Sequence, residues 1–88
     1  MDGEEKKLVG KITHYYGKIG VAVVQVMDEL NVGDEISIEG PVTNVKQRVE
    51  SMQIEHENIQ KAKAGDDIGM KVADKVREND NVYKITAA

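Results

Sequence analysis

The sequence predicts an all-β fold in which short antiparallel strands form one closed barrel. Val (12) and Ile (8) greatly outnumber Leu (2), and β-branched residues favour strands. Apolar and polar residues alternate in several segments, and one turn pattern recurs three times. No segment has the three-to-four-residue apolar period of a long helix. A sandwich fits the same pattern, but closure hides strand edges better in a chain of 88 residues.

The first strands are predicted over residues 8–15 and 19–27, with a short Gly-containing turn between them. The second of these runs is almost continuously apolar. Residues 35–39 alternate strictly, so their two Ile side chains share one face. The positions expected to be buried in these strands are Ile12, Val21, Val23, Ile36 and Ile38.

Residues 42–54 are predicted as one strand with a bulge near Glu50 and Ser51. Val45 and Val49 share one parity, whereas the apolar residues after the bulge take the other. Residues 68–72 alternate again, and residues 82–85 form a last strand. Residues 55–63 have only Ile59 to anchor a helix, so their structure stays open. Further buried positions are expected at Ile54, Ile68 and Met70.

Three turns share the order Gly or Asn, then Asp, one polar residue and a β-branched residue. Gly and Asn accept positive φ at low cost, and the Asp carboxylate can accept a hydrogen bond from a free backbone N–H. Each turn therefore leads the chain into a strand. The predicted structural turn residues are Gly33, Asp34, Gly65, Asp66, Asn79 and Asp80.

Composition favours a single domain over residues 8–86, preceded by a charged flexible arm over residues 1–7. The chain has no Cys, and 16 acidic against 12 basic residues give a net charge of −4. This balance argues against duplex-DNA binding. The longest apolar run near the N-terminus is too short for a membrane span. We expect no membrane partner and a cytoplasmic location.

Nothing in the sequence predicts catalysis, a cofactor or a metal site. No glycine-rich phosphate loop opens a helix, and both Ser residues lie inside predicted strands. Only two His residues are present. Adjacent pairs such as Asp66 and Asp67 point to opposite faces of a strand, which favours turn capping over a cation site. His56 is expected in a solvated loop.

The candidate binding residues are mostly in one segment where basic and aromatic side chains alternate. Single-stranded RNA needs this combination, a ring to stack on a base and cations for the backbone. A tyrosine that caps the open end of the barrel would give the same pattern, and alternating charges on an outer strand also protect an edge. The candidates are Lys11, His14, Tyr15, Tyr16 and Lys18, with Lys46 and Arg48 on the strand over residues 42–54.

The segments THYYGKIGVAVVQV, LNVGDEISIEG and AGDDIG carry a resemblance. The chain resembles the second domain of elongation factor Tu-type translation GTPases, and more closely their small stand-alone elongation factor-like relatives. This resemblance implies a closed antiparallel barrel of six or seven strands. It also implies an accessory module without a GTPase domain, which binds single-stranded or tRNA-like RNA or a protein partner in translation.

The alternative is a protein-interaction module. Similar barrels form the C-terminal domain of collagenase-like peptidases and of RNA-hydroxylase relatives, so a free copy could dock in trans to a peptidase-like or RNA-modifying enzyme. The acidic composition favours this alternative, whereas the Tyr-Lys segment favours RNA. Both readings describe a protein that is not itself an enzyme.

Overall fold

The computed structural model describes residues 4–87, and these residues contain strands but no α-helix. No helix long and apolar enough to cross a membrane occurs among them. The strands are β1 (Glu4–Tyr16), β2 (Val21–Val26), β3 (Leu30–Asn31), β4 (Glu35–Glu39), β5 (Asn44–Arg48), β6 (Met52–Ile54), β7 (Glu57–Ile59), β8 (Lys61–Ala62), β9 (Asp67–Lys71) and β10 (Asn81–Ala87). The all-β prediction is confirmed.

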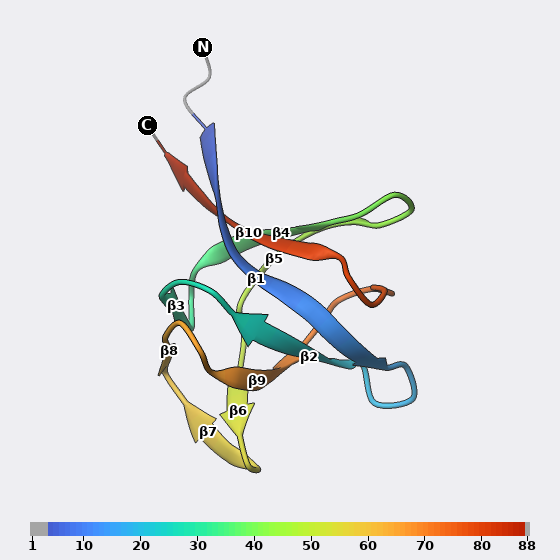
Figure 1. Ribbon diagram of the computed structural model, residues 1–88, viewed down its shortest axis with the longest axis vertical. Coiled ribbons are helices and arrows are strands. Elements are labelled where there is room, and N and C mark those ends of the chain that lie inside the picture. The colour runs from blue at the N-terminus through green and yellow to red at the C-terminus, as the bar shows by residue number, and fades with distance from the viewer. Residues whose placement is uncertain (1–3, 88) are drawn as a thin grey trace.

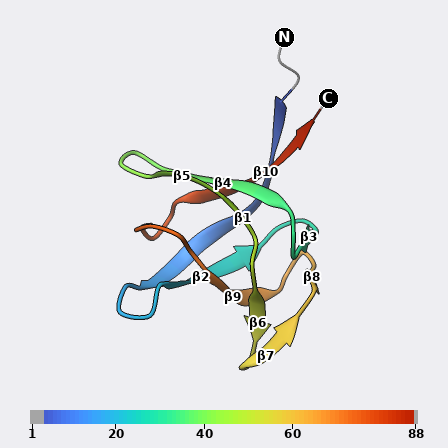
Figure 2. The same ribbon diagram turned by 180° about the vertical axis from the view of Figure 1, so that it is seen from behind.

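Eight strands form one sheet in the order β5-β4-β10-β1-β2-β9-β6-β7, and β3 pairs with β8 in a separate small sheet (Figure 1). Their pairings are antiparallel. The long strands β1 and β10 run side by side, which brings the two chain ends to the same end of the molecule (Figures 1 and 2). The fold is therefore a strongly bent sheet around one core.

The sheet does not close, so the barrel prediction is not confirmed. β5 lies at one end of the sheet and β6 with β7 at the other. The single bulged strand predicted over residues 42–54 is wrong, because β5 and β6 occupy opposite ends. Val49 separates them: its N–H donates to the carbonyl of Asp34 (2.8 Å), and its carbonyl accepts from the N–H of Gly33 (2.9 Å). Strand β5 thus ends before Val49, because the turn at Gly33 and Asp34 hydrogen-bonds both the N–H and the carbonyl of this residue.

One side chain bridges the gap between the ends of the sheet. From β5, Gln47 Nε2 donates to the carbonyl of Lys71 (3.0 Å), and Gln47 Oε1 accepts from the N–H of Ala73 (2.7 Å). These are the bonds that a neighbouring backbone would make in a ladder. A single amide therefore links β5 to the end of β9 without a continuous strand pairing.

The core lies on the inner face of the sheet, and most of the predicted buried positions belong to it. Ile12, Ile36, Ile38, Ile68 and Met70 are fully or almost fully buried. The prediction for Val21 and Val23 is wrong, because Ala22, Val24 and Val26 face the core instead. The apolar run of β2 occupies both parities, so alternation could not decide which face is inside. Ile54 is only partly buried against the core.

Strand β1 begins before the predicted start of the domain. Residues 4–7 pair with the end of β10, with Glu4 opposite Ala87 and Lys7 opposite Lys84. The part of the predicted flexible arm that the structure describes is therefore strand, because β10 also extends to meet it. The rest of the predicted arm, residues 1–3, lies outside the described residues.

The three repeated turns share one geometry. Gly33, Gly65 and Asn79 have φ values of 97°, 97° and 74°, the positive values that the repeat predicts. In each turn the following Asp accepts a hydrogen bond at Oδ2 from the N–H three residues earlier: Asp34 from Asn31 (2.8 Å), Asp66 from Lys63 (3.0 Å) and Asp80 from Arg77 (2.8 Å). The repeat is thus a structural unit.

Each turn also forms two backbone hydrogen bonds with one buried β-branched residue from another segment. Val49, Val26 and Ile12 accept from the N–H of Gly33, Gly65 and Asn79, and they donate to the carbonyls of Asp34, Asp66 and Asp80. All six distances lie between 2.7 and 2.9 Å. The turns therefore tie distant parts of the chain together around the core.

Replacing Gly33 by Val is expected to lower the free energy of unfolding by about 1–2 kcal/mol, because an L residue is strained at positive φ. A Cβ at Gly33 would meet no atom within 4 Å, so the loss comes from the backbone alone. Gly33→Asn is the matched control, since Asn79 already occupies the equivalent position. Urea denaturation measures both variants, and equal stabilities for Val and Asn would contradict the account.

Candidate functional site

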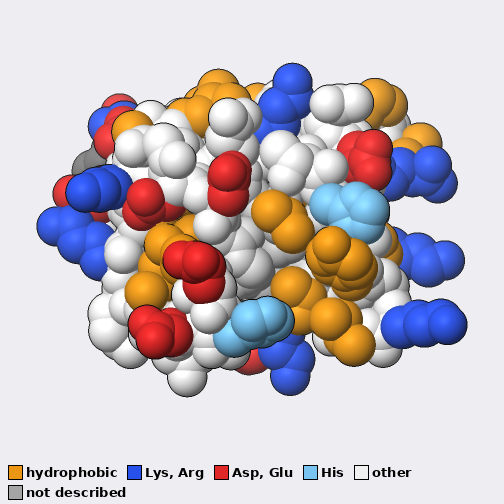
Figure 3. Space-filling model, turned by 60° about the horizontal axis from the view of Figure 1, so that its bottom comes forward, with side chains coloured by type: hydrophobic (Ala, Val, Ile, Leu, Met, Phe, Trp, Pro, Cys, Tyr) orange, Lys and Arg blue, Asp and Glu red, His pale blue; other side chains and the backbone are white. Residues whose placement is uncertain are grey.

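The outer face of the sheet carries an apolar hollow of about 390 Å³ over strands β1, β2, β9 and β6. Val21, Val23 and Gly69 form its floor. Its remaining lining comes from the β1–β2 hairpin and the β6–β7 hairpin, and consists of Tyr16, Ile19, Gln53, Glu55 and His56. Figure 3 shows hydrophobic side chains gathered on this face beside histidine.

Strand register explains why these side chains lie together. His14, Val23, Gly69, Gln53 and Asn58 stand opposite one another across five neighbouring strands. In an antiparallel sheet, residues directly opposite each other share a face. The adjacent outward row contains Tyr16, Val21 and Lys71.

A bulge in β1 brings the aromatic residues onto this face. The register shifts between Ile12 and His14, and the hydroxyl of Thr13 donates to the carbonyl of Val23 (3.3 Å). Ile12 therefore points into the core, while His14 and Tyr16 lie outward opposite Val23 and Val21. The His14 and Tyr16 rings then stack at a tilt of 52°, with centroids 4.3 Å apart.

Gly69 creates the depth of the hollow, because it has no side chain in the middle of the outward row. A Cβ at this position would lie 3.6 Å from Val21 Cγ1, which is ordinary contact. The backbone therefore tolerates a larger residue here, and a larger side chain would fill the hollow. This makes Gly69 a useful position for testing the site.

This face exposes more apolar side chains than the solvated face of an antiparallel sheet usually does. Ile19 is 67% exposed and Tyr16 is 49% exposed. In an antiparallel sheet with one solvated face, polar residues usually alternate with the buried ones. Contiguous exposed apolar side chains with a polar rim are typical of an interaction surface.

The rim at the β6–β7 hairpin has an unusual backbone. Ile54 and Glu57 pair directly, so Glu55 and His56 form a two-residue loop, with φ values of 51° and 69°. Two central residues at positive φ define a type I′ turn, which favours Asn-Gly. Here the turn holds the Glu55 and His56 side chains at the edge of the hollow instead. His56 is exposed, in agreement with the predicted solvated loop.

The structure separates the predicted binding residues. His14 and Tyr16 share the outer face, and Lys18 is exposed in the turn after Tyr16. Tyr15 points the other way and packs against the core. Lys11 lies in a different outward row, opposite Gln25 and Asn81. Lys46 and Arg48 are on β5, which β4 and β10 separate from β1 in the sheet order.

Sequence reasoning missed the strand residues that line the hollow, namely Val21, Val23, Gln53 and Gly69. One signal was present. The run over residues 19–24 is apolar on both parities, which indicates a strand with two apolar faces. The contribution of Gly69 depends on cross-strand register, which no local pattern specifies.

A larger hollow of about 630 Å³ lies at the β4–β5 hairpin, but its chemistry is less specific. Its lining is mostly polar, and Lys6 Nζ and Glu39 Oε2 within it already pair at 2.6 Å. Ser37, which is fully buried, donates its hydroxyl to the same Glu39 Oε2 (2.7 Å). Among residues 4–87, no group of three or more His, Asp or Glu side chains could hold a metal.

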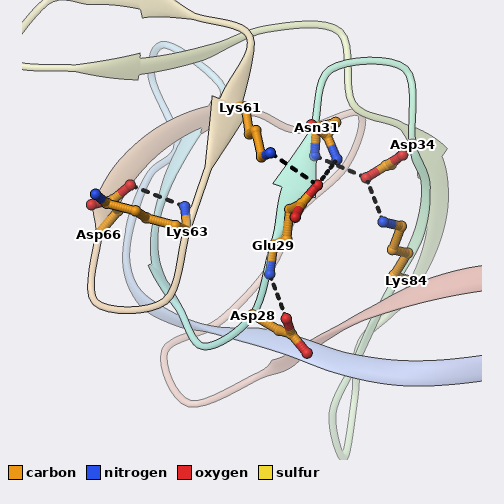
Figure 4. Close-up of polar contacts among 8 residues, drawn as sticks. All are labelled: Asp28, Glu29, Asn31, Asp34, Lys61, Lys63, Asp66 and Lys84. Carbon is orange, nitrogen blue, oxygen red and sulfur yellow. Dashed lines mark hydrogen bonds and ion pairs between the residues drawn. The ribbon is translucent and has the colours of Figure 1, made fainter.

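Charged side chains form a separate network around the β2–β3 connection (Figure 4). Lys61 Nζ lies 3.4 Å from Glu29 Oε2, and Lys84 Nζ lies 3.3 Å from Asp34 Oδ2. The hydrogen bond from Lys7 and the backbone N–H of Glu29 lower the pKa of Asp28. A hydrogen bond from Asn31 and the charge of Lys61 lower the pKa of Glu29. Hydrogen bonds from Lys6 and Ser37 lower the pKa of Glu39.

Acidification is expected to destabilise the protein through these carboxylates. Each has a native pKa below its ordinary value. Its contribution to the stability of the fold is therefore complete at pH values above the ordinary pKa, and it is lost as the pH falls through the native pKa. The ordinary value for Glu29 and Glu39 is 4.5. The melting temperature should therefore decrease as the pH is lowered below about 4.5. Glu39→Gln should make this decrease with pH less steep. A melting temperature that rises on acidification would contradict this.

Comparisons with known proteins relate the chain to peptidases. No protein-family model matches the sequence. The chain is 40% identical over 76 residues to an uncharacterized protease of Methanocaldococcus jannaschii, which covers 85% of this chain and 19% of that protein. It is also 40% identical over 82 residues to a collagenase of Porphyromonas gingivalis, which covers 91% of this chain and 23% of the collagenase.

A solved structure has the same fold. The C-terminal domain of a putative U32 peptidase from Geobacillus thermoleovorans superimposes with a TM-score of 0.84 and 23% sequence identity. The match covers 89% of this chain and 91% of that domain. The selenomethionine variant of the same domain gives a TM-score of 0.82.

These findings correct the functional expectation. The proposed kinship with elongation factor Tu-type proteins is wrong, as is the accessory translation role drawn from it, because the relatives are proteases and collagenases and the structural match is a peptidase domain. The peptidase-linked alternative fits better. The chain spans about a fifth of the length of the curated relatives that it matches.

Proposed function

We propose that this chain is a non-catalytic protein-interaction module that docks on the catalytic part of a U32 peptidase-like protein. The observation that carries the proposal is the extent of the match. Almost the whole chain aligns with a collagenase at 40% identity, yet it covers only 23% of that protein. Such a segment is a module within a larger architecture, and its own surface then decides what it does.

The outer-face hollow supports docking over catalysis. Its floor is formed by two Val side chains and a Gly, which offer neither a nucleophile nor a general base, and Glu55 and His56 at the rim are both exposed. Apolar side chains at the centre with polar groups at the edge are the usual anatomy of a protein interface. The hydroxyl of Thr13, close to this face, is already bonded to a backbone carbonyl.

A pull-down tests the proposal. The chain is immobilised and exposed to a nuclease-treated lysate of the cells that produce it, and retained proteins are identified by mass spectrometry. We expect a U32 peptidase-like protein to be enriched relative to beads that carry an unrelated small β protein. Retention of RNA in an untreated lysate, without any such peptidase, would contradict the proposal.

An activity assay tests the non-catalytic part separately. The chain alone should release no fluorescence from labelled gelatin or casein over hours. Cleavage that follows the protein through two purification steps would overturn this part of the proposal.

A further inference from the structure

We infer that the hollow binds an acidic segment of a protein partner, and that one large apolar side chain of this segment sits over Gly69. The inference deepens the proposed docking function and rests on it. It specifies the chemistry of the bound segment and its direction across the sheet.

The shape and lining of the hollow indicate an apolar anchor. Its volume of about 390 Å³ lies near the lower end of the range for binding pockets. Its floor is aliphatic, and a Cβ added at Gly69 would find only ordinary contacts. Interfaces gain most of their binding energy from a few large side chains in pockets of this kind. The depth over Gly69 therefore fits one anchor residue.

Two lysines neighbour lining residues of the hollow, one in the sheet and one in the chain. Lys71 stands directly opposite Val21 in the outward row, and Lys18 lies in the turn between Tyr16 and Ile19. Neither forms an ion pair with another of the described residues. Figure 3 shows basic side chains projecting beside the apolar cluster. These two positive charges complement an acidic segment, although the chain as a whole has a net charge of −4.

The opposite wall has different chemistry and gives the segment a direction. Glu55 and His56 lie there, on the β6–β7 turn, together with the side-chain amide of Gln53. The acidic flank of the segment therefore points toward Lys18 and Lys71, because Glu55 repels negative charge at the other side. Hydrogen-bonding groups of the partner face the Gln53 side.

The same features disfavour nucleic acid. Stacked bases need aromatic platforms, and the ring of Tyr16 is already packed against His14. Among the other lining residues only His56 has a ring, and it lies on the turn at the rim. A phosphate backbone would also meet Glu55 on the far wall. A peptide with a single apolar anchor, unlike a nucleic acid, can contact both the apolar floor and the neighbouring lysines.

Peptide binding to the full chain tests the inference. The probes are three labelled ten-residue peptides. In the first, Phe and Leu are flanked by Asp, and in the second the same two residues are flanked by Lys. In the third, Ser replaces both Phe and Leu and the Asp flanks are kept. Fluorescence anisotropy is measured at low salt. We expect saturable binding of the first peptide, and affinities lower by about tenfold or more for the other two.

Variants of the chain then test the site. Gly69→Val fills the hollow and Val23→Thr places a hydroxyl on its floor, and each should weaken binding of the acidic peptide about tenfold. Lys71→Glu should also weaken binding of the acidic peptide. It should reduce the difference in affinity between the Asp-flanked and the Lys-flanked peptide. Lys63→Glu makes the same charge change in the turn between β8 and β9 and should have no effect. Thermal melts confirm that each variant is folded.

The outcomes separate this inference from the proposed function. Equal binding of acidic and basic peptides, or full binding by both Gly69→Val and Val23→Thr, would overturn the inference. A labelled single-stranded RNA that binds while all peptides fail would also overturn it. A peptidase captured equally well by the wild type and by Gly69→Val would leave the docking function standing and reject this surface.

Discussion

Replacing Ile12 by Ala is expected to lower the free energy of unfolding by about 2–5 kcal/mol, the usual cost of removing a buried Ile side chain to Ala. Ile12 is fully buried. Its N–H donates to the carbonyl of Asp80 and its carbonyl accepts from the N–H of Asn79, so the neighbouring backbone is held and the cavity cannot collapse easily. A domain of this size has only about 4–13 kcal/mol of stability. This substitution therefore unfolds a measurable fraction of the protein.

Ile19→Ala is the matched control for this prediction. Ile19 carries the same side chain but is 67% exposed at the wall of the outer hollow. Its removal should change the free energy of unfolding by less than about 0.5 kcal/mol, while it weakens binding of the acidic peptide. Urea denaturation followed by circular dichroism measures both variants. Similar losses of stability for the two would contradict the assignment of inner and outer faces.

Replacing Glu55 and His56 together by Asn-Gly is expected to stabilise the protein by about 2 kcal/mol, because both residues now lie at positive φ in a type I′ turn. The same change removes two side chains from the rim of the hollow. Glu55 repels negative charge, so its removal should tighten binding of the acidic peptide while the melting temperature rises. The strained turn is then kept because it places the charge that gives the bound segment its direction.

A single variant separates the two effects. His56→Gly should give part of the gain in stability, and it keeps Glu55 at the rim. Thermal melts and peptide anisotropy are measured on the same samples. A double variant that is less stable than the wild type would show that the turn has no strain to relieve, and unchanged binding would remove Glu55 and His56 from the site.

The sequence predicts the elements that depend on local chemistry. The three turns have the positive φ values expected from Gly and Asn, and the strand over residues 35–39 matches β4 because alternation leaves one parity apolar. Ile36 and Ile38 are buried for the same reason. In these segments the local pattern and the fold agree.

The elements that depend on distant pairing were not predictable in this way. Val21 and Val23 lie in an apolar run without alternation, so only the pairing with β1 and β9 decides that they face outward. Residues 49–51 look like a bulge, but the turn at Gly33 and Asp34 takes the backbone of Val49 and ends β5. The hollow over Gly69 exists only because of this long-range register.

The candidate RNA-binding segment shows the same limit. Lys11, His14, Tyr15 and Tyr16 are close in sequence, but a bulge after Ile12 changes the parity of β1. Tyr15 then joins the core while His14 and Tyr16 face outward. Interleaved aromatic and basic residues therefore did not define one surface. The residues that do define the hollow come from four strands and two hairpin turns.

The most direct test of the central claim is calorimetric titration of the U32 peptidase-like protein retained in the pull-down with this chain and with its Gly69→Val variant. We predict saturable binding of the wild type, loss of about tenfold or more in affinity for Gly69→Val, and wild-type affinity for Lys63→Glu. Absence of heat with the wild type at high micromolar concentrations would contradict the account of this chain as a docking module of such a peptidase.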